Sequence, residues 1–244
     1  MTRMTTSLRV PRLPLPLGAQ VVGDGIIRDA NLVAEYRFNE GQGQVLTDYT
    51  GNGHDGQLGS TGGADADDPD WSAEGLVFTA ANSDIVTCDT AGISGGAART
   101  VIAAVFPNAS GQFGIEWPGS GPNFERYTLR ELGLSLLRLE VAGAGYTSTT
   151  LTITGEAWNF VAVTQSTSNL NTAVLYLNGA SEAVTLDQVI DTKGNFTFGR
   201  SAGVFQEMRA AYGLVYNIAL TADQIEQNRT ALTNILAARG ITLP

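Results

Sequence analysis

The stretch Leu32-Val33-Ala34-Glu35-Tyr36-Arg37-Phe38 decides the fold class. Apolar and polar side chains alternate along it, as expected for a β-strand that buries one face. Many short strands without interleaved helices predict an all-β protein, a two-sheet antiparallel jelly-roll β-sandwich. Similar runs recur at residues 75–79, 84–88, 99–106, 112–117, 134–141, 148–154, 158–165, 173–178, 195–200 and 211–217.

The composition agrees with one folded domain. The chain has 244 residues, of which 43% are hydrophobic and 16% are charged. This is enough apolar material for a full core and too little charge for a disordered polymer. The 29 glycines suit the tight turns that many short strands need.

The charge pattern excludes nucleic acid as a partner. The net charge is −10, and Lys193 is the one lysine among 14 basic residues, so a basic stripe for phosphate groups is lacking. No apolar run approaches the length that spans a bilayer, so we expect no membrane insertion.

The first 30 residues differ from the rest in composition, and we interpret residues 1–30 as an extended N-terminal arm. Prolines interrupt its apolar stretch, which argues against a secretion signal. We expect the arm to pack either on its own domain or on a neighbouring subunit. The residues predicted to make these contacts are Arg3, Arg9, Arg12, Leu13, Leu15 and Leu17.

The last segment has a helical period. Thr221 and Gln224 fit a capping box, and Gly240 stands where a helix C′ residue is expected. The sequence therefore predicts a sandwich over residues 31–220 and a C-terminal helix and tail over 221–244. The apolar positions of the helix, Ile225, Leu232, Ile235 and Leu236, form a narrow stripe that can dock on the sandwich or on a partner helix, and we favour the sandwich.

With a single cysteine and a single histidine, the chain lacks the residues for most common catalytic and metal sites of these types. Cys88 lies in an alternating run, which is typical of a buried structural thiol, and no intrachain disulfide is possible. His54 lies in a glycine-rich turn, where an exposed turn residue is the simpler interpretation than a catalytic base.

Several motifs follow one another in the order typical of a known family. The opening strand and turn of residues 32–43 precede the loop Asp48-Tyr49-Thr50-Gly51-Asn52-Gly53-His54-Asp55-Gly56. With these motifs, about residues 31–225 resemble the laminin-G-like branch of the concanavalin-A-like jelly-roll family. Further matches lie at residues 75–78, 82–86, 100–105, 158–164, 173–179, 198–200 and 214–221.

The resemblance implies a jelly roll that serves as a sugar-binding module, an adhesion domain or a structural part. We expect no obligatory cofactor, and calcium is the candidate ion because it prefers several oxygen ligands. The family's Asp-Glu pair in the penultimate strand is replaced here by Ala210 and Ala211. Candidate ligands are Asp48, Asn52, Asp55, Asn82 and Asp84, with a separate acidic cluster at Asp65, Asp67, Asp68 and Asp70 that lacks the EF-hand pattern.

Sugar binding requires an exposed aromatic side chain flanked by hydrogen-bonding groups. Trp117 at a strand end, with Glu116 beside it, is the best candidate, and Tyr127 and Tyr146 are secondary ones. Trp158 matches a core position of the family and is expected to be buried. No run supplies the two carboxylates, about 5 Å apart, that a retaining glycosidase needs, so we expect no catalysis.

The family is mainly extracellular, whereas this chain shows neither a secretion signal nor a disulfide. A location in a phage particle would explain an extracellular role without a secretion signal or a disulfide, because virion proteins fold in the host cytoplasm and are released on lysis. The predicted function is therefore a non-catalytic virion component, a tail or fibre part or a capsid decoration. Its partners would be other virion subunits or copies of itself, with surface polysaccharide as a further ligand. The alternatives are a free-standing carbohydrate-binding module of a secreted system and a degenerate polysaccharide hydrolase or lyase.

Overall fold

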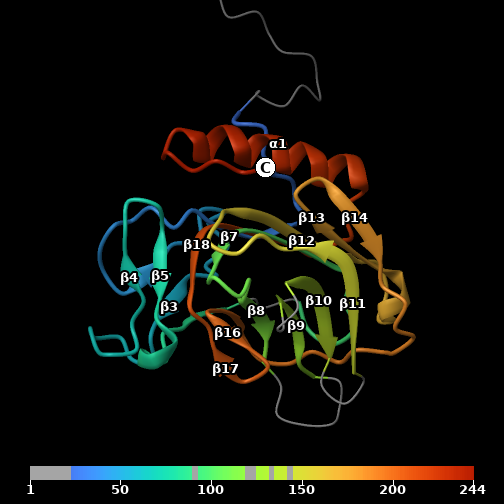
Figure 1. The fold of residues 1–244 in the computed structure, drawn as a ribbon, viewed down its shortest axis with the longest axis horizontal. Coiled ribbons are helices and arrows are strands. Elements are labelled where there is room, and N and C mark those ends of the chain that lie inside the picture. Colours follow the sequence, from blue (N-terminus) through green and yellow to red (C-terminus); the bar gives the residue numbers. More distant parts are fainter. Residues whose placement is uncertain (1–22, 90–92, 119–124, 132–134, 142–144) are drawn as a thin grey trace, which may run out of the picture.

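The computed structural model describes residues 23–89, 93–118, 125–131, 135–141 and 145–244, and for residues 145–148 the backbone alone. The fold has three layers: a helix, an eight-stranded sheet A beneath it, and an eight-stranded sheet B below that (Figure 1). All strand pairs described are antiparallel. The predicted all-β, two-sheet sandwich with a C-terminal helix is confirmed.

Sheet A has the strand order β14-β13-β12-β7-β18-β5-β4, and β1 pairs with β18 beside this path. All five residues of β1 are buried, so both faces of this strand are covered, whereas its alternation predicted one exposed face. The strands are β1 (Leu32–Tyr36), β4 (Asp70–Trp71), β5 (Leu76–Phe78), β7 (Arg99–Pro107), β12 (Asn159–Gln165), β13 (Ala173–Leu177), β14 (Ala180–Ala183) and β18 (Met208–Tyr216).

Sheet B has the order β11-β10-β9-β8-β15-β6-β3-β2. A two-stranded hairpin, β16 (Arg200–Ser201) with β17 (Val204–Phe205), contacts β8 and β9. Two short 3-10 turns, η1 (Ala80–Asn82) and η2 (Leu170–Thr172), complete the elements. The strands of sheet B are β2 (Val45–Leu46), β3 (Gly56–Leu58), β6 (Val86–Cys88), β8 (Gly114–Trp117), β9 (Tyr127–Glu131), β10 (Leu136–Val141), β11 (Gly145–Thr152) and β15 (Phe196–Phe198).

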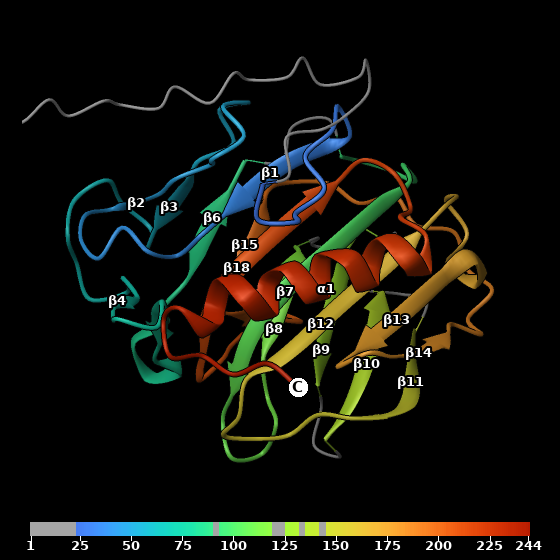
Figure 2. The same ribbon diagram turned by 90° about the horizontal axis from the view of Figure 1, so that it is seen from above.

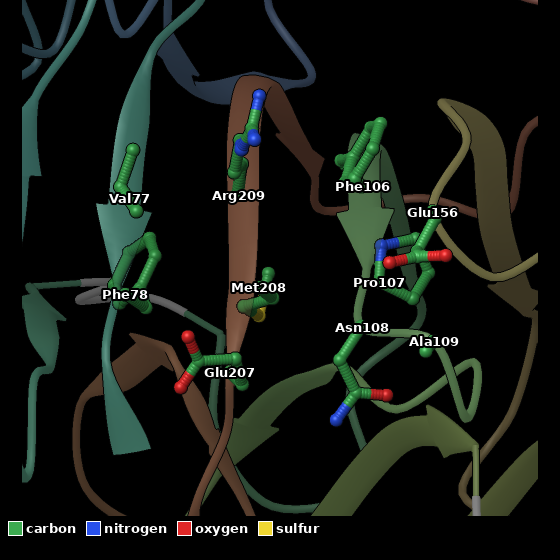
Figure 3. A pocket seen from close by; sticks show the side chains of 10 residues that line it. All are labelled: Val77, Phe78, Phe106, Pro107, Asn108, Ala109, Glu156, Glu207, Met208 and Arg209. Atoms are coloured by element: carbon green, nitrogen blue, oxygen red, sulfur yellow. The ribbon is translucent and has the colours of Figure 1, made fainter. Parts of the chain in front are cut away.

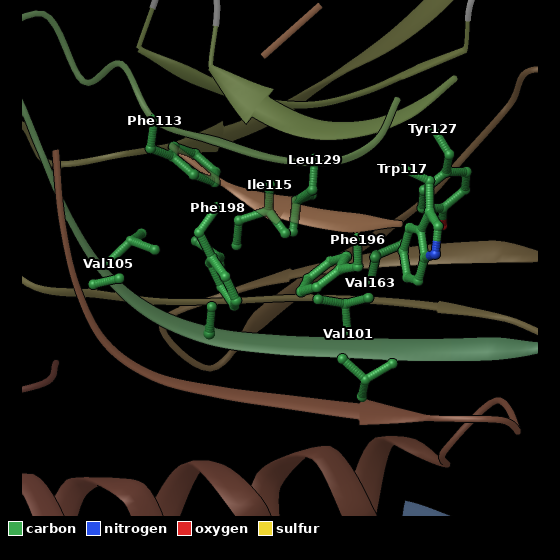
Figure 4. Packing of buried hydrophobic residues seen from close by; sticks show 14 of the residues in the cluster. Val101, Val105, Phe113, Ile115, Trp117, Tyr127, Leu129, Val163, Phe196 and Phe198 are labelled. Atoms are coloured by element: carbon green, nitrogen blue, oxygen red, sulfur yellow. The ribbon is translucent and has the colours of Figure 1, made fainter. Parts of the chain in front are cut away.

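The main core lies between the two sheets (Figure 4). Phe196 and Phe198 of β15 pack edge to face at a centroid distance of 4.9 Å. Phe198 also meets Phe38 at 5.1 Å, and Trp117 meets Phe196 at 4.7 Å. Edge-to-face aromatic pairs add attraction to the large apolar area they bury. This cluster fixes how sheet B stacks on sheet A.

The helix α1 (Ala222–Ala237) crosses the outer face of sheet A (Figure 2). The predicted capping box is present, with the Thr221 side chain accepting from the Gln224 amide and Gln224 accepting from the Thr221 amide. Gly240, at φ +77°, ends the helix as predicted: its N–H donates to Ala237, and the Ile241 N–H donates to Leu236. A second apolar cluster joins the helix to sheet A, so docking on the same sandwich is confirmed.

The end of the predicted arm belongs to the sandwich. Ile26 and Ile27 are buried in the cluster beneath α1. The Ile27 N–H donates to Asn228 Oδ1 at 3.0 Å, and the Ile27 carbonyl accepts from the Tyr216 hydroxyl at 2.9 Å. The alternative in which the arm packs on its own domain therefore holds for Ile26 and Ile27, which contact the helix and β18. Arg3, Arg9, Arg12, Leu13, Leu15 and Leu17 lie outside the described residues.

Within the described ranges, no helix is long and apolar enough to cross a membrane.

Candidate functional site

The outer face of sheet B carries a row of charged side chains. Along β8 and β9, Trp117, Tyr127 and Leu129 point into the core between the sheets. Because side chains alternate between the two faces of a strand, Glu116, Thr128 and Arg130 lie on the opposite face. Cross-strand pairing places Glu116 opposite Thr128, and Thr128 opposite Glu140.

The predicted exposure of Trp117 and Tyr127 is wrong. Both side chains are 1% exposed, and their rings lie 5.9 Å apart. The guanidinium of the buried Arg99 lies 5.0 Å from the Trp117 ring and 5.3 Å from the Tyr127 ring. Proximity to a glycine-rich loop suggested a surface position, but Trp117 shares its strand face with Ile115 and so turns inward. The side chain of Tyr146 lies outside the described residues, and Trp158, at 7% exposure, is buried as expected.

Glu116 connects the β16–β17 hairpin to sheet B. Its Oε2 accepts hydrogen bonds from the Thr128 hydroxyl at 3.0 Å and the Ala202 N–H at 2.7 Å, and Arg200 lies 3.4 Å from Oε1. Gly114 makes the close approach possible, since a Cβ there would overlap the Arg200 carbonyl oxygen. With 1% exposure, Glu116 is a structural anchor rather than a surface group ready to meet a sugar.

Two arginines, Arg126 and Arg130, contact Glu140 on the same face. Arg126 Nη2 donates to Glu140 Oε1 at 2.7 Å, and Arg130 Nη1 lies 3.4 Å from Oε2. Arg138 is also buried on this face. Burial lowers the pKa of Arg130, and repulsion from Arg138 and Arg126 adds to this against the attraction of Glu140. Ion pairs thus join the start and middle of β9 to β10, and the Glu116–Thr128 hydrogen bond joins β8 to β9.

A surface cavity of about 250 Å³ lies at the other sheet, where β5 and β7 end and β18 begins (Figure 3). We call it the Phe106 pocket. Its apolar lining includes Val77, Phe106, Pro107 and Met208. Two exposed carboxylates, Glu156 and Glu207, and the amide of Asn108 also line it.

The side chains that line the Phe106 pocket carry a net negative charge. The Arg209 guanidinium lies 4.7 Å from the centre of the Phe106 ring and forms an ion pair of 2.6 Å with Glu74. Arg209 is thereby neutralised from outside the pocket. Glu207 accepts one hydrogen bond from the Ala80 N–H, and Glu156 stands on a left-handed backbone with φ +52°. The pocket therefore combines an apolar floor with acceptors on its rim.

The predicted metal ligands of the glycine-rich loop have structural roles. Asp48 accepts from the backbone N–H groups of Glu35, Thr50 and His54. Asp55 accepts from the Asp48 N–H at 2.7 Å. Backbone N–H groups of the loop and of β1 therefore bind the Asp48 carboxylate and one oxygen of Asp55.

The other predicted ligands, Asn52, Asn82 and Asp84, differ in their surroundings. Asn52 donates its amide to the carbonyls of Leu32 and Val33, which ties the loop to β1. Asn82 is exposed on η1, whereas Asp84 is 1% exposed. Among the described residues, the acidic side chains that converge as a metal-sized group are Asp65, Asp67 and Asp68.

Sequence reasoning missed the Phe106 pocket altogether. Its residues come from three strands and two turns that are far apart along the chain. One signal was present in the sequence. A buried strand ends at Phe106-Pro107-Asn108, and the aromatic side chain of Phe106 lies on the outer face of sheet A. That signal alone does not indicate which strands stand beside it.

No protein-family model matches the sequence, and no curated protein matches it significantly. Solved structures do share its fold. Domain 4 of the extracellular arabinanase AbnA from Geobacillus stearothermophilus, solved with arabinotriose, is 17% identical, with 84% of this chain and 100% of that one covered and a TM-score of 0.59.

Two longer proteins contain a similar sandwich. Trypanosoma rangeli sialidase is 15% identical, with 91% of this chain covered and a TM-score of 0.58, and the botulinum neurotoxin serotype D binding domain is 13% identical, with 84% covered and a TM-score of 0.58. This chain spans 35% of the sialidase and 52% of the toxin domain. At these identities the likeness shows the β-sandwich fold alone.

Proposed function

We propose that this chain is a non-catalytic recognition domain that binds a neutral sugar unit of a surface polysaccharide in the Phe106 pocket. The observation that carries the proposal is the combination of an apolar floor with two exposed carboxylates on the rim. A sugar ring presents C–H groups on its faces and hydroxyl groups at its edge. The apolar floor of the pocket suits the C–H faces of the sugar, and the carboxylates on the rim suit its hydroxyl groups.

The charge of the pocket selects the kind of sugar. Glu156 and Glu207 accept hydrogen bonds from hydroxyl groups and repel anions. Arg209 does not offset them, because Glu74 already pairs with it at 2.6 Å. We therefore propose a neutral sugar rather than a uronic or sialic acid.

The structural neighbours support a binding role. The arabinanase domain was solved with arabinotriose, and the toxin neighbour is a binding domain. The laminin-G-like resemblance of the sequence is consistent with both. The carboxylates on sheet B support the non-catalytic part of the proposal, because Glu116 is bound by Thr128 and Ala202 and Glu140 by Arg126.

For the biological setting we propose a virion, with the chain as a tail or fibre part or a capsid decoration. Its single cysteine is buried, so the fold is independent of disulfides, as suits a protein that folds in a reducing cytoplasm. Residues 1–22 hold three of the 14 basic residues and none of the 24 acidic ones. A basic arm on an acidic body suits contacts between copies.

The pocket is tested by calorimetric titration of the full chain with arabinotriose and, separately, with sialic acid, followed by a panel of neutral oligosaccharides. We expect saturable binding of a neutral glycan that weakens at least tenfold in Glu156→Gln and Glu207→Gln. The matched control, Glu226→Gln, removes the same charge on α1 and should bind normally. Binding of sialic acid alone, or binding unaffected by both pocket variants, would refute the proposal.

The assembly role is tested by mass photometry of the full chain and of residues 23–244. Oligomers that require residues 1–22 support it. Monomers in both cases, with equal glycan affinity, contradict it and favour a free-standing carbohydrate-binding module. Release of smaller sugars from any of the neutral oligosaccharides in the panel would contradict the non-catalytic assignment.

A further inference from the structure

A second cavity lies between the helix and the β13–β14 hairpin, on the outer face of sheet A. Its volume is about 290 Å³. Phe160 of β12, Tyr176 of β13 and Ile225 of α1 form its apolar lining. We call this cavity the α1 pocket.

Acidic side chains border the α1 pocket. Asp223 and Glu226 are exposed on α1 at its edge, and Arg229 lies beside them. Arg229 donates to both carboxylate oxygens of Glu226 at 2.7 Å and to the Pro244 carbonyl oxygen at 2.7 Å. Asp223 takes part in none of the ion pairs formed by the described residues. The residues that line the pocket therefore combine a net negative charge with an apolar floor.

The described chain begins beside the same helix. The Gly25 carbonyl accepts from Gln227 Nε2 at 3.0 Å, and a Cβ on Gly25 would lie 3.1 Å from Ala231 Cβ. The segment that precedes residue 23 is therefore attached at the surface of α1. Residues 1–22 are long enough to span about 70 Å when extended. This length suffices to reach the α1 pocket of a neighbouring copy.

The sequence of residues 9–17 complements the α1 pocket. It reads Arg9-Val10-Pro11-Arg12-Leu13-Pro14-Leu15-Pro16-Leu17, with two arginines and no acidic residue. Frequent proline favours extended polyproline II backbone, which aromatic-lined grooves recognise. The leucine and proline side chains suit the apolar lining of the pocket, and the arginines suit the carboxylates at its edge.

We propose that residues 9–17 of one copy bind the α1 pocket of a neighbouring copy. This inference rests on the assembly role proposed above and names the surface that the arm contacts. Each copy supplies one arm and one pocket, so the contact is heterologous and joins copies head to tail. The Phe106 pocket stays open to a glycan in such an assembly, because it shares no lining residue with the α1 pocket.

Cross-linking between two full-length variants tests where the arm binds. Gly18→Cys places a thiol directly after residues 9–17, and Ser181→Cys places one on the exposed edge of the α1 pocket. The native Cys88 is buried and should not compete. After the two variants are mixed with a short bis-maleimide, we expect cross-linked peptides that join residues 18 and 181. The matched control, Ser166→Cys, places the thiol at the other end of β12 and should give at least tenfold less product.

Self-association of the full chain tests the pocket without a cross-linker. Ser181→Arg adds bulk and positive charge at the pocket edge, and we expect it to weaken self-association at least tenfold in analytical ultracentrifugation. Ser166→Arg, the matched control, should associate as the wild type does. Asp223→Arg should also weaken association, and adding Arg9→Glu and Arg12→Glu to that chain should restore it, because the charges are then reversed on both sides.

The outcomes separate this docking site from the assembly role itself. Oligomers that require residues 1–22 but are unaffected by Ser181→Arg and Asp223→Arg would overturn the α1 pocket as the site and leave the assembly role standing. A failure to cross-link the mixed variants above the control level would also overturn it, because each chain carries one of the two introduced thiols. A monomeric wild type would instead refute the assembly role, and this inference with it.

Discussion

The buried carboxylate of Glu35 accepts a hydrogen bond of 2.5 Å from the hydroxyl of Tyr212. The same carboxylate accepts from Arg28 at 2.6 Å and from Arg37 at 2.9 Å, and the Glu35 side chain is fully buried. Breaking one side of a buried ion pair is strongly destabilising. We expect Glu35→Gln to lower the free energy of unfolding by about 3 kcal/mol, measured by urea denaturation.

The comparison for Glu35 is an exposed pair of the same kind. Glu226 and Arg229 lie 2.7 Å apart on α1, with the Glu226 side chain 52% exposed. Solvent screens such pairs, so Glu226→Gln should cost less than about 1 kcal/mol. Equal losses in the two variants would contradict a special role for the Glu35 network.

The pH dependence of stability should carry the signature of Glu35. Burial opposes its ionisation, but the hydrogen bonds from Arg28, Tyr212 and Arg37 outweigh burial and hold the pKa of Glu35 below its usual range. A carboxyl group whose pKa falls on folding contributes stability that is complete above the unfolded-state pKa, about 4.3. This contribution disappears as the pH falls through the lower, folded-state pKa. The gap in melting temperature between wild type and Glu35→Gln should therefore shrink below about pH 4, as calorimetry would show.

The strand pattern and the helix caps could be predicted from local sequence, whereas burial at strand ends could not. Thr221, Gln224 and Gly240 act through bonds within a few residues, so their roles follow from spacing alone. Trp117 was misplaced because its environment depends on Arg99 and Phe196, which lie on other strands. Local alternation indicates which residues share a face but not which face turns inward.

The candidate sites show the same limit. The sequence offers Asp48 as a metal ligand because it lies in a glycine-rich loop. The fold instead places the backbone N–H groups of Glu35 and Thr50 on this carboxylate, a contact that spacing alone does not reveal. The strand β9 was not predicted from the sequence. Thr128 and Arg130 on its outer face belong to a buried polar network that only cross-strand pairing creates, so this strand does not alternate between apolar and exposed polar residues.

Gly213 and Phe198 form a close contact between the sheets. A Cβ on Gly213 would lie 2.8 Å from Phe198 Cζ. Overpacking a core commonly costs 1–3 kcal/mol, so we expect Gly213→Ala to destabilise by about 2 kcal/mol. Phe198→Leu removes the clashing atoms, so the double variant should be more stable than the sum of the two single losses predicts. Strict additivity in urea denaturation would argue against the contact.

Cys88 should resist thiol reagents in the folded protein. The side chain is fully buried, and burial raises the pKa of its thiol to about 12. The thiolate is the reactive form, so a disulfide reagent at pH 8 should label the native chain negligibly and the urea-unfolded chain fully. Rapid labelling of native protein would show that this part of the core opens.

Two truncations should differ sharply although they are only eight residues apart. Removing residues 1–22 leaves Ile26 and Ile27 in the cluster beneath α1, so the monomer should keep its unfolding midpoint. Removing residues 1–30 takes away both side chains and leaves Asn228 Oδ1 and the Tyr216 hydroxyl without their partners. We expect this second truncation to lower the free energy of unfolding by roughly 3–5 kcal/mol, measured by urea denaturation. If both truncated chains unfold at the same midpoint, residues 23–30 are not part of the folded domain.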